Sequence, residues 1–199
     1  MYRNCLKRAF DILFSCIGLL TLLPVFLVMA VWIKADSRGG VFYRQVRVGL
    51  HGKQFRIFKF RSMRLGSDQG SQITIGERDS RITRSGLFIR KYKLDELPQL
   101  INVFLGDMSF VGPRPEVPKY VDLYTDAQRK VLDVRPGITD MASIKYSNEN
   151  ELLGKAEDPE AYYIQTIMPD KLSINLEYVK NHSFAGDIAI IFKTLFKIL

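Results

Sequence analysis

The chain has 199 residues, of which 47% are hydrophobic and 25% charged, and its net charge at pH 7 is +8. This length suits one domain with a hydrophobic core, and the composition excludes a disordered or low-complexity chain. Cys5 and Cys16, the two cysteines, have no metal-ligand spacing and form no disulfide framework, which is typical of a reducing compartment.

Charge is divided unevenly along the chain. Residues 1–94 carry 18 Lys and Arg against 5 Asp and Glu, whereas residues 95–199 carry 11 against 16. Such asymmetry indicates that the first half faces an anionic partner. Nucleic acid, acidic lipid headgroups and a phosphorylated substrate are the candidates.

An uncharged apolar segment covers residues 12–33. At about 1.5 Å per residue, a straight helix of this length would cross a bilayer core of roughly 30 Å. Pro24 lies near the middle, where it removes a backbone hydrogen bond and kinks the helix. Basic residues flank both ends, although positive charge normally gathers on the cytoplasmic side alone. A re-entrant hairpin that breaks at Pro24 is therefore slightly favoured, and a single spanning helix remains the alternative.

A β-hairpin is predicted over residues 41–48 and 54–60, which are rich in β-branched and aromatic side chains and enclose the turn 49–52. Residues 66–80 are rich in Gly, Ser, Asp and Gln and predict an exposed loop. A helix is expected near residues 80–93.

Further helices are expected at 98–105, 116–133 and 158–168 and from about 173 to the end, with a turn at 135–139. The expected fold is mixed α/β and mostly helical. Apolar residues in the last helix recur at helical spacing, at Phe184, Ile188, Ile191, Phe192, Leu195, Phe196 and Leu199. This pattern suits a helix in the membrane interface and a core-packing helix equally well.

Two adjacent carboxylates, Asp95 and Glu96, precede a short apolar helix that Pro98 can open and Gly106 can close. Carboxylates near a helix N-terminus are expected to stay ionised, and an ionised carboxylate can be a nucleophile or a metal ligand. The rigid turn at residues 112–115 fixes the guanidinium of Arg114, which suits a phosphate.

Alone, such an acidic pair most often caps a helix. Its basic neighbours favour a site for a diphosphate and a divalent cation, because acids can hold Mg²⁺ while basic groups neutralise phosphate oxygens. The candidates for phosphate binding are Lys59, Arg61, Arg90 and Arg114.

Residues 94–115, which include Leu-Asp-Glu-Leu-Pro-Gln-Leu and end in Phe-Val-Gly-Pro-Arg-Pro, resemble the bacterial sugar transferase family. Its members are monotopic phosphoglycosyl transferases that start glycan assembly on a polyprenyl phosphate. Residues 59–63 and 134–139 also look like motifs of that family, and the similarity covers almost the whole chain in the family's order.

The resemblance implies transfer of a sugar 1-phosphate from a UDP-sugar to polyprenyl phosphate with release of UMP. Asp95 would be the nucleophile and would lie near Mg²⁺, and Glu96 would act as a base or support the metal. The residues that would bind phosphates or the nucleotide are Lys59, Arg61, Arg90 and Arg114.

The resemblance also implies a re-entrant anchor over residues 1–36 and a compact catalytic domain over residues 37–199, with interfacial helices. The protein would contact phospholipids on the cytoplasmic face of the bacterial inner membrane. Leu23-Pro24 departs from the family's usual Ser-Pro break, and a leucine cannot satisfy carbonyls freed by a kink. Residues 140–146 also depart from the common pattern. They can select the sugar, for which an N-acetylated amino sugar is the first expectation.

A different class of function remains as the alternative. A membrane-anchored basic module that binds anionic lipid or nucleic acid would explain the anchor and the charge asymmetry. It would leave Asp95, Glu96 and the 112–115 turn without a role, and no nucleic-acid-binding motif accompanies the charge. We therefore expect no nucleic-acid partner, and the sequence predicts no oligomeric state.

Overall fold

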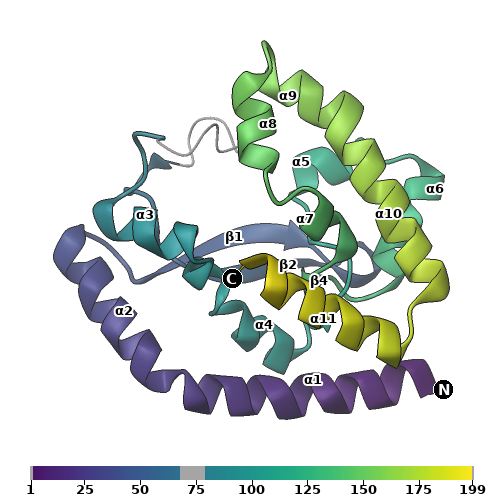
Figure 1. Ribbon diagram of the computed structural model, residues 1–199, viewed down its shortest axis with the longest axis horizontal. Helices are drawn as coiled ribbons and strands as arrows, with labels where there is room; N and C mark the ends of the chain where they lie inside the picture. The colour runs from purple at the N-terminus through teal and green to yellow at the C-terminus, as the bar shows by residue number, and fades with distance from the viewer. Residues whose placement is uncertain (1, 68–78, 199) are drawn as a thin grey trace.

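The computed structural model describes residues 2–67 and 79–198 (Figure 1). Its helices surround two small two-stranded sheets, which confirms the predicted mixed α/β class. The predicted loop at 66–80 falls mostly on residues 68–78, and these lie outside the described residues.

The N-terminal apolar segment forms two helices, α1 (Tyr2–Thr21) and α2 (Leu23–Asp36), which are bent by 59° relative to each other (Figure 1). The break lies at Leu22 and Pro24 is in the first turn of α2, so the predicted break near Pro24 is confirmed. Thr21 Oγ1 lies at the break and donates hydrogen bonds to the carbonyl oxygens of Ile17 (2.9 Å) and Gly18 (3.3 Å). The Gly18 carbonyl also accepts the N–H of Leu22 (2.9 Å), so Thr21 adds hydrogen bonds in the last turn of α1 before the break.

No single described helix is both long enough and apolar enough to cross a membrane. The bent pair passes that test by length and composition when residues 5–21 and 23–36 are taken together. Re-entry into one leaflet remains a prediction.

The first helix is also docked onto the rest of the protein through a buried carboxylate. Asp11 is only 2% exposed, and its Oδ1 accepts hydrogen bonds from Ser109 Oγ and the backbone N–H of Phe110, both at 3.1 Å. Two turns further on, a Cβ added at Gly18 would lie 3.1 Å from the side chain of Leu100. The small residue therefore permits close approach of α1 to α4 (Gln99–Leu105).

Basic side chains at the start of α1 add to this docking. Arg8 donates to the carbonyl oxygens of Val103 (2.6 Å) and Phe104 (2.7 Å), at the end of α4 where carbonyls lack intrahelical partners. Lys7 forms an ion pair with Asp187 of the last helix. These contacts tie α1 to both an inner and a C-terminal helix.

The predicted hairpin is confirmed to within a residue, as strands β1 (Phe42–Val48) and β2 (Gln54–Phe60). They pair antiparallel, with Tyr43 opposite Lys59 and Gln45 opposite Ile57. Because side chains alternate between the faces of a strand, Lys59 shares one face with Gln45 and Arg47.

A second sheet pairs β3 (Ser109–Val111) in parallel with β4 (Gly137–Thr139). The predicted turn at 135–139 is therefore wrong for its last three residues. A Cβ added at Gly137 would meet the backbone nitrogen of Gly112 at 2.1 Å, so the two backbones meet at a distance that only glycine allows here.

The remaining helices are α3 (Arg84–Lys91), α4, α5 (Pro118–Val121), α6 (Asp126–Arg129), α7 (Met141–Lys145), α8 (Glu149–Lys155), α9 (Pro159–Tyr162), the π-helical segment η5 (Tyr163–Ile167), α10 (Met168–Asn181) and α11 (Phe184–Ile198). The single helix predicted at 116–133 is wrong, because the Thr125 capping box starts a new helix there and a 3₁₀ segment, η4 (Lys130–Asp133), follows. The helix predicted from 173 to the end is two helices that break at His182 and Ser183.

The C-terminal helix packs on the protein with one face, as the core-packing interpretation predicts, and the interfacial placement of its other face stays a prediction. In α11, Asp187 and Ile190 are buried against the protein, whereas Phe192, Leu195 and Phe196 are exposed, the last by 79%. Leu199 lies outside the described residues.

Among the described residues, a small apolar cluster of Ile57, Val103 and Met108 packs β2 against the end of α4, and two further clusters position the other elements around the hairpin. One joins the end of β1 to α5, η5 and α10 and contains Val48, Val117, Tyr120, Val121, Tyr124, Val131, Leu153, Tyr163, Ile167, Met168 and Leu172. The other joins α2 to the hairpin and α3 and contains Met29, Ile33, Phe60 and Ile89. The hairpin is therefore held between the N-terminal helices and the C-terminal helices.

We expect Asp11→Leu to destabilise the protein by about 1–3 kcal/mol, because Ser109 and the Phe110 N–H would lose their buried acceptor. Asp11→Asn keeps a carbonyl oxygen and should cost less. Denaturant unfolding in detergent micelles measures the difference. A Leu variant as stable as the native protein would show that this docking contact contributes nothing.

Candidate active site

The two carboxylates lie on a single tight turn between helices. Lys93 adopts a left-handed conformation (φ 55°) and is followed by the 3₁₀ turn η3 (Leu94–Glu96). Pro98 then caps α4, and Gly106 ends it with φ 96°. The predicted opening and closing residues of this helix are confirmed.

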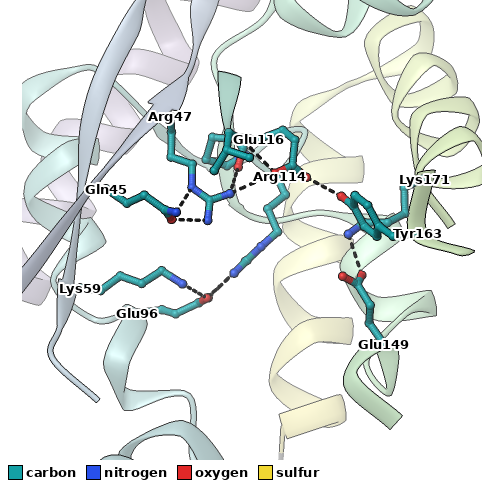
Figure 2. Close-up of polar contacts among 11 residues, drawn as sticks. Gln45, Arg47, Lys59, Glu96, Arg114, Glu116, Glu149, Tyr163 and Lys171 are labelled. Atoms are coloured by element: carbon teal, nitrogen blue, oxygen red, sulfur yellow. Dashed lines mark hydrogen bonds and ion pairs between the residues drawn. The ribbon is translucent and has the colours of Figure 1, made fainter. Parts of the chain in front are cut away.

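Glu96 bridges two cations from different parts of the fold (Figure 2). Its Oε1 lies 2.8 Å from Lys59 Nζ of the hairpin, and both of its oxygens accept hydrogen bonds from the guanidinium of Arg114. Burial opposes ionisation of Glu96, but Arg114 and Lys59 outweigh it and hold the pKa of the carboxyl well below its usual range. Glu96 is therefore an ionised counter-ion whose oxygens are already engaged.

Asp95 has a different environment, although it is the next residue. It is 8% exposed, and within the described residues its carboxylate takes part in no hydrogen bond and no ion pair. Burial raises its pKa and the negative charge of Glu96 adds to the effect, whereas the charge of Lys59 opposes it. Burial therefore opposes the ionisation of Asp95 that the helix N-terminus was expected to favour, and the ionised state of Asp95 stays a prediction.

Of the other two residues that were predicted to bind phosphate, Arg90 lies near this carboxylate pair and Arg61 does not. Arg90, half-buried in the last turn of α3, is near enough for its charge to favour ionised Asp95. Arg61 is not brought to the pair. Its guanidinium donates to carbonyl oxygens at the end of α2, including those of Ser37 (2.8 Å) and Ile33 (3.4 Å). A phosphate contact by Arg61 stays a prediction.

The turn that carries Arg114 is held from both sides. The N–H of Gly137 donates to the carbonyl oxygen of Pro113 at 3.0 Å, and Arg47 Nη1 donates to that of Pro115 at 3.0 Å. Prolines on both sides of Arg114 restrict its backbone further. The direction of this guanidinium is therefore fixed before any ligand binds.

Arg47 and Glu116 are site residues that the sequence did not single out (Figure 2). Arg47 donates to Glu116 Oε1 (3.3 Å) and, through Nη2, to Gln45 Oε1 (2.7 Å), and Tyr163 donates its hydroxyl to Glu116 Oε2. Burial lowers the pKa of Arg47, while Glu116 opposes the shift. The sequence offered one signal that could have identified Arg47 as a site residue. The alternation of side chains along β1 places it on the same face of the hairpin as Lys59.

Acidic residues of the 140–151 segment flank Arg114 on its other side. Glu96 raises the pKa of Arg114 most, and the charges of Asp140 and Glu149 raise it further. Asp140 caps α7 by accepting from the N–H of Ser143 (2.9 Å), and Glu149 pairs with Lys171 at 2.7 Å (Figure 2). The segment that departs from the family's common pattern is thus electrostatically coupled to the site.

The residues of the site fit a Mg²⁺ ion that would be coordinated mainly by the phosphate oxygens of a bound substrate and only in part by the protein. No group of three or more His, Cys, Asp or Glu side chains that could hold a metal occurs within residues 2–67 and 79–198. Glu96 is engaged by two cations, which leaves Asp95 as the available carboxylate. Mg²⁺ is commonly bound by one or two carboxylates together with phosphate oxygens and water.

Comparison with known proteins adds an independent finding. A family model described as "Bacterial sugar transferase" matches residues 2–199. The "Uncharacterized sugar transferase EpsL" of Bacillus subtilis is 38% identical over 199 residues, which cover 98% of this chain and 87% of that protein.

Two longer relatives carry more specific names. The "UDP-glucose:undecaprenyl-phosphate glucose-1-phosphate transferase" of Klebsiella pneumoniae is 36% identical over 195 residues, 96% of this chain and 39% of that protein. The "UDP-N-acetylgalactosamine-undecaprenyl-phosphate N-acetylgalactosaminephosphotransferase" of Aeromonas hydrophila is 39% identical over 199 residues, 98% of this chain and 44% of that protein. The chain thus spans less than half the length of both.

A double-mutant cycle tests the buried pair that supports the Arg114 turn. Arg47→Met should lower the free energy of unfolding by about 1–3 kcal/mol, because it leaves the partly buried Glu116 carboxylate without its counter-charge. The double variant Arg47→Met/Glu116→Gln should cost less than the sum of the two single variants. Denaturant unfolding in micelles measures each, and the exposed Lys155–Glu151 pair is the control, with no measurable coupling. Strict additivity at Arg47 and Glu116 would refute the pairing.

Proposed function

Because the chain belongs to the bacterial sugar transferase family, we propose that it transfers a sugar 1-phosphate from a UDP-sugar to polyprenyl phosphate and releases UMP. The observation that carries this proposal is the division of roles between two adjacent carboxyls, of which Asp95 is buried and Glu96 partly buried. Asp95 is unengaged and its pKa is raised, whereas Glu96 is ionised between two cations. Environments that push two neighbouring pKa values apart are typical of an acid–base or nucleophilic site.

In the first step, Asp95 would attack the phosphorus that bears the sugar. A bond forms between a carboxylate oxygen of Asp95 and this phosphorus, and the bond from phosphorus to the bridging oxygen breaks. UMP leaves with that oxygen and its electron pair. The enzyme then holds an aspartyl phosphosugar, the intermediate expected of a carboxylate nucleophile.

In the second step, an oxygen of polyprenyl phosphate would attack the same phosphorus. The acyl phosphate bond breaks, Asp95 is regenerated as a carboxylate, and polyprenyl diphosphosugar is the product. Arg114 and Lys59, held on opposite sides of Glu96, would neutralise phosphate oxygens in both steps. Arg90 would add charge on the side of Asp95.

The geometry supports a counter-ion role for Glu96 over the role of a base. Its oxygens already accept hydrogen bonds from Lys59 and Arg114, and its pKa lies well below the ordinary range, so it has little tendency to take a proton. We propose that Glu96 keeps the two cations in place and prevents their mutual repulsion.

We propose Mg²⁺ as the cofactor, held by Asp95 and by the diphosphate of the substrate. When bound, it would neutralise charge on the phosphate oxygens. The chain's own part is to present one desolvated carboxylate beside fixed cations.

The site would operate at a membrane surface, on the cytoplasmic face of the bacterial inner membrane. Large apolar side chains of α1, α2 and α11 are exposed, including Leu20, Val31 and Phe196, and such surfaces are typical of contact with lipid. A soluble UDP-sugar and a lipid phosphate can meet there.

The alternative of a basic lipid- or nucleic-acid-binding module is less well supported. Lys59, Arg47 and Arg114 are paired with Glu96 and Glu116 rather than presented on an open surface. A binding module also has no use for the unengaged Asp95.

The proposal is tested by measuring UMP release from a panel of UDP-sugars with polyprenyl phosphate and Mg²⁺. Because the named relatives differ in their sugars, the panel includes glucose and N-acetylated amino sugars. We expect release with at least one sugar, loss of release on chelation of Mg²⁺, and background activity in Asp95→Asn, which removes the nucleophile. Turnover in that variant would reject the covalent mechanism. No release from any sugar by the folded protein would favour the binding module.

Glu96→Gln should bind UMP about tenfold more tightly, because it removes the negative charge that competes with the nucleotide for Lys59 and Arg114. It should also lower kcat, since the two cations lose their common partner. Calorimetry with UMP and steady-state kinetics measure the two effects, with exposed Glu151→Gln as the unchanged control. Weaker UMP binding in Glu96→Gln would contradict the counter-ion role.

A further inference from the structure

A second basic region lies where α2 ends and α3 begins. It is an open hollow of about 540 Å³ lined by Asp36, Ser37, Arg38, Arg64, Leu65, Thr83 and Arg84. None of these residues belongs to the candidate active site. A hollow of this size is large enough for a phosphate group and part of a headgroup.

The arginines of this hollow differ from those of the active site in having no partners. Within the described residues, the guanidinium groups of Arg38, Arg64 and Arg84 form no hydrogen bond and no ion pair. By contrast, Arg47 and Arg114 are both paired with glutamates. Three unpaired cations around one hollow attract an anion.

The one acidic residue that lines the hollow, Asp36, offsets only part of this charge; hydrogen bonds from Ser85 and, less strongly, the charge of Arg84 lower its pKa. Asp36 Oδ2 already accepts hydrogen bonds from the N–H (2.9 Å) and the hydroxyl (2.8 Å) of Ser85. The hollow also contains a spare polar group, because Ser37 Oγ is buried and has no hydrogen-bond partner within the described residues. One carboxylate against three guanidinium groups leaves a net positive charge.

Aromatic residues beside the hollow indicate its depth relative to a membrane. Trp32 precedes Asp36 by about one helical turn and packs on Phe88 of α3 with ring centroids 5.3 Å apart, and Phe88 packs on Tyr92 at 4.7 Å. All three rings are exposed. Trp and Tyr gather at the level of lipid headgroups, so the hollow lies at that level if α1 and α2 enter a bilayer.

We propose that this hollow binds the phosphate head of a membrane lipid at a site distinct from Asp95. Guanidinium groups bind phosphate through paired hydrogen bonds, and unpaired ones are free to do so. Arg84 starts α3, and Arg90, whose charge acts on Asp95, lies about 9 Å further along it, so the hollow and the reacting carboxylate are served by opposite ends of this helix. The inference rests on the proposed membrane attachment and not on the proposed reaction.

Two lipids carry this chemistry, an anionic phospholipid and polyprenyl phosphate. The full chain has one tryptophan, Trp32, which reports on lipids next to the hollow. The protein is placed in phosphatidylcholine nanodiscs that contain a minor fraction of brominated phosphatidylglycerol or, separately, the same fraction of brominated phosphatidylcholine. Binding in the hollow predicts stronger quenching of Trp32 by the anionic lipid.

The variant Arg38→Gln/Arg64→Gln/Arg84→Gln should reduce this excess quenching to the level given by phosphatidylcholine. Lys34→Gln is the matched control for diffuse charge, because it lies in the last turn of α2 outside the hollow, and Arg129→Gln on α6 is the remote control. Both controls should keep most of the excess. Single Arg→Lys replacements, which keep the charge but lose the planar fork, should give intermediate values even if the triple variant folds poorly.

Addition of polyprenyl phosphate separates the two lipid sources. If a small mole fraction of polyprenyl phosphate abolishes the excess quenching of Trp32, the hollow binds polyprenyl phosphate. If the excess quenching is unchanged, the hollow binds phospholipid. Both outcomes support a site for a lipid phosphate. The inference is overturned if the triple variant keeps the excess quenching, or if Lys34→Gln removes as much of it. No UDP-sugar is present, so a failure of the proposed reaction would leave this result unaffected.

Discussion

The ion pairs of Glu96 with Lys59 and Arg114 are the interaction on which the site depends. They join three parts of the fold that are distant in sequence, the hairpin, the turn η3 and the Gly-Pro-Arg-Pro turn. A partly buried triad of this kind is stable only when the geometry satisfies all its members, because each unpaired charge would carry a desolvation cost. The second pair, Arg47 with Glu116, meets part of this requirement by fixing the backbone that follows Arg114, while the Gly137 N–H holds the backbone that precedes it.

The same triad explains why the pKa values of two adjacent carboxyls shift in opposite directions, up for Asp95 and down for Glu96. Glu96 receives the positive charge of both cations directly, whereas Asp95 makes no direct contact with them and burial raises its pKa. A cation that is already neutralised by one carboxylate stabilises a second one less. The neighbour that holds the cations thereby leaves the other carboxyl with the higher basicity that a nucleophile needs.

The sequence predicted the parts of this arrangement that depend on local signals. The hairpin followed from its β-branched strands and turn, and the helix after Asp95 and Glu96 followed from Pro98 and Gly106. Local signals could not reveal that the guanidinium of Arg61 donates to carbonyl oxygens at the end of α2. They also could not reveal that buried Asp11 of α1 accepts the N–H of Phe110. Both depend on contacts between segments tens of residues apart, and an alternation or charge pattern within one segment carries no information about them.

Asp11 also bears on how a membrane segment can serve a catalytic site. Its carboxylate accepts from Ser109 and Phe110 at the strand that leads into the Arg114 turn, and Arg8 caps the helix that follows Asp95 and Glu96. The first helix is therefore packed against the elements that aim the reacting groups, and is more than a tether. If this helix enters the bilayer as proposed, its docking would set both the height and the orientation of the carboxylate pair relative to the lipid. That constraint is what a reaction between a water-soluble nucleotide sugar and a lipid phosphate requires, because the lipid phosphate is confined to a thin layer at the membrane surface.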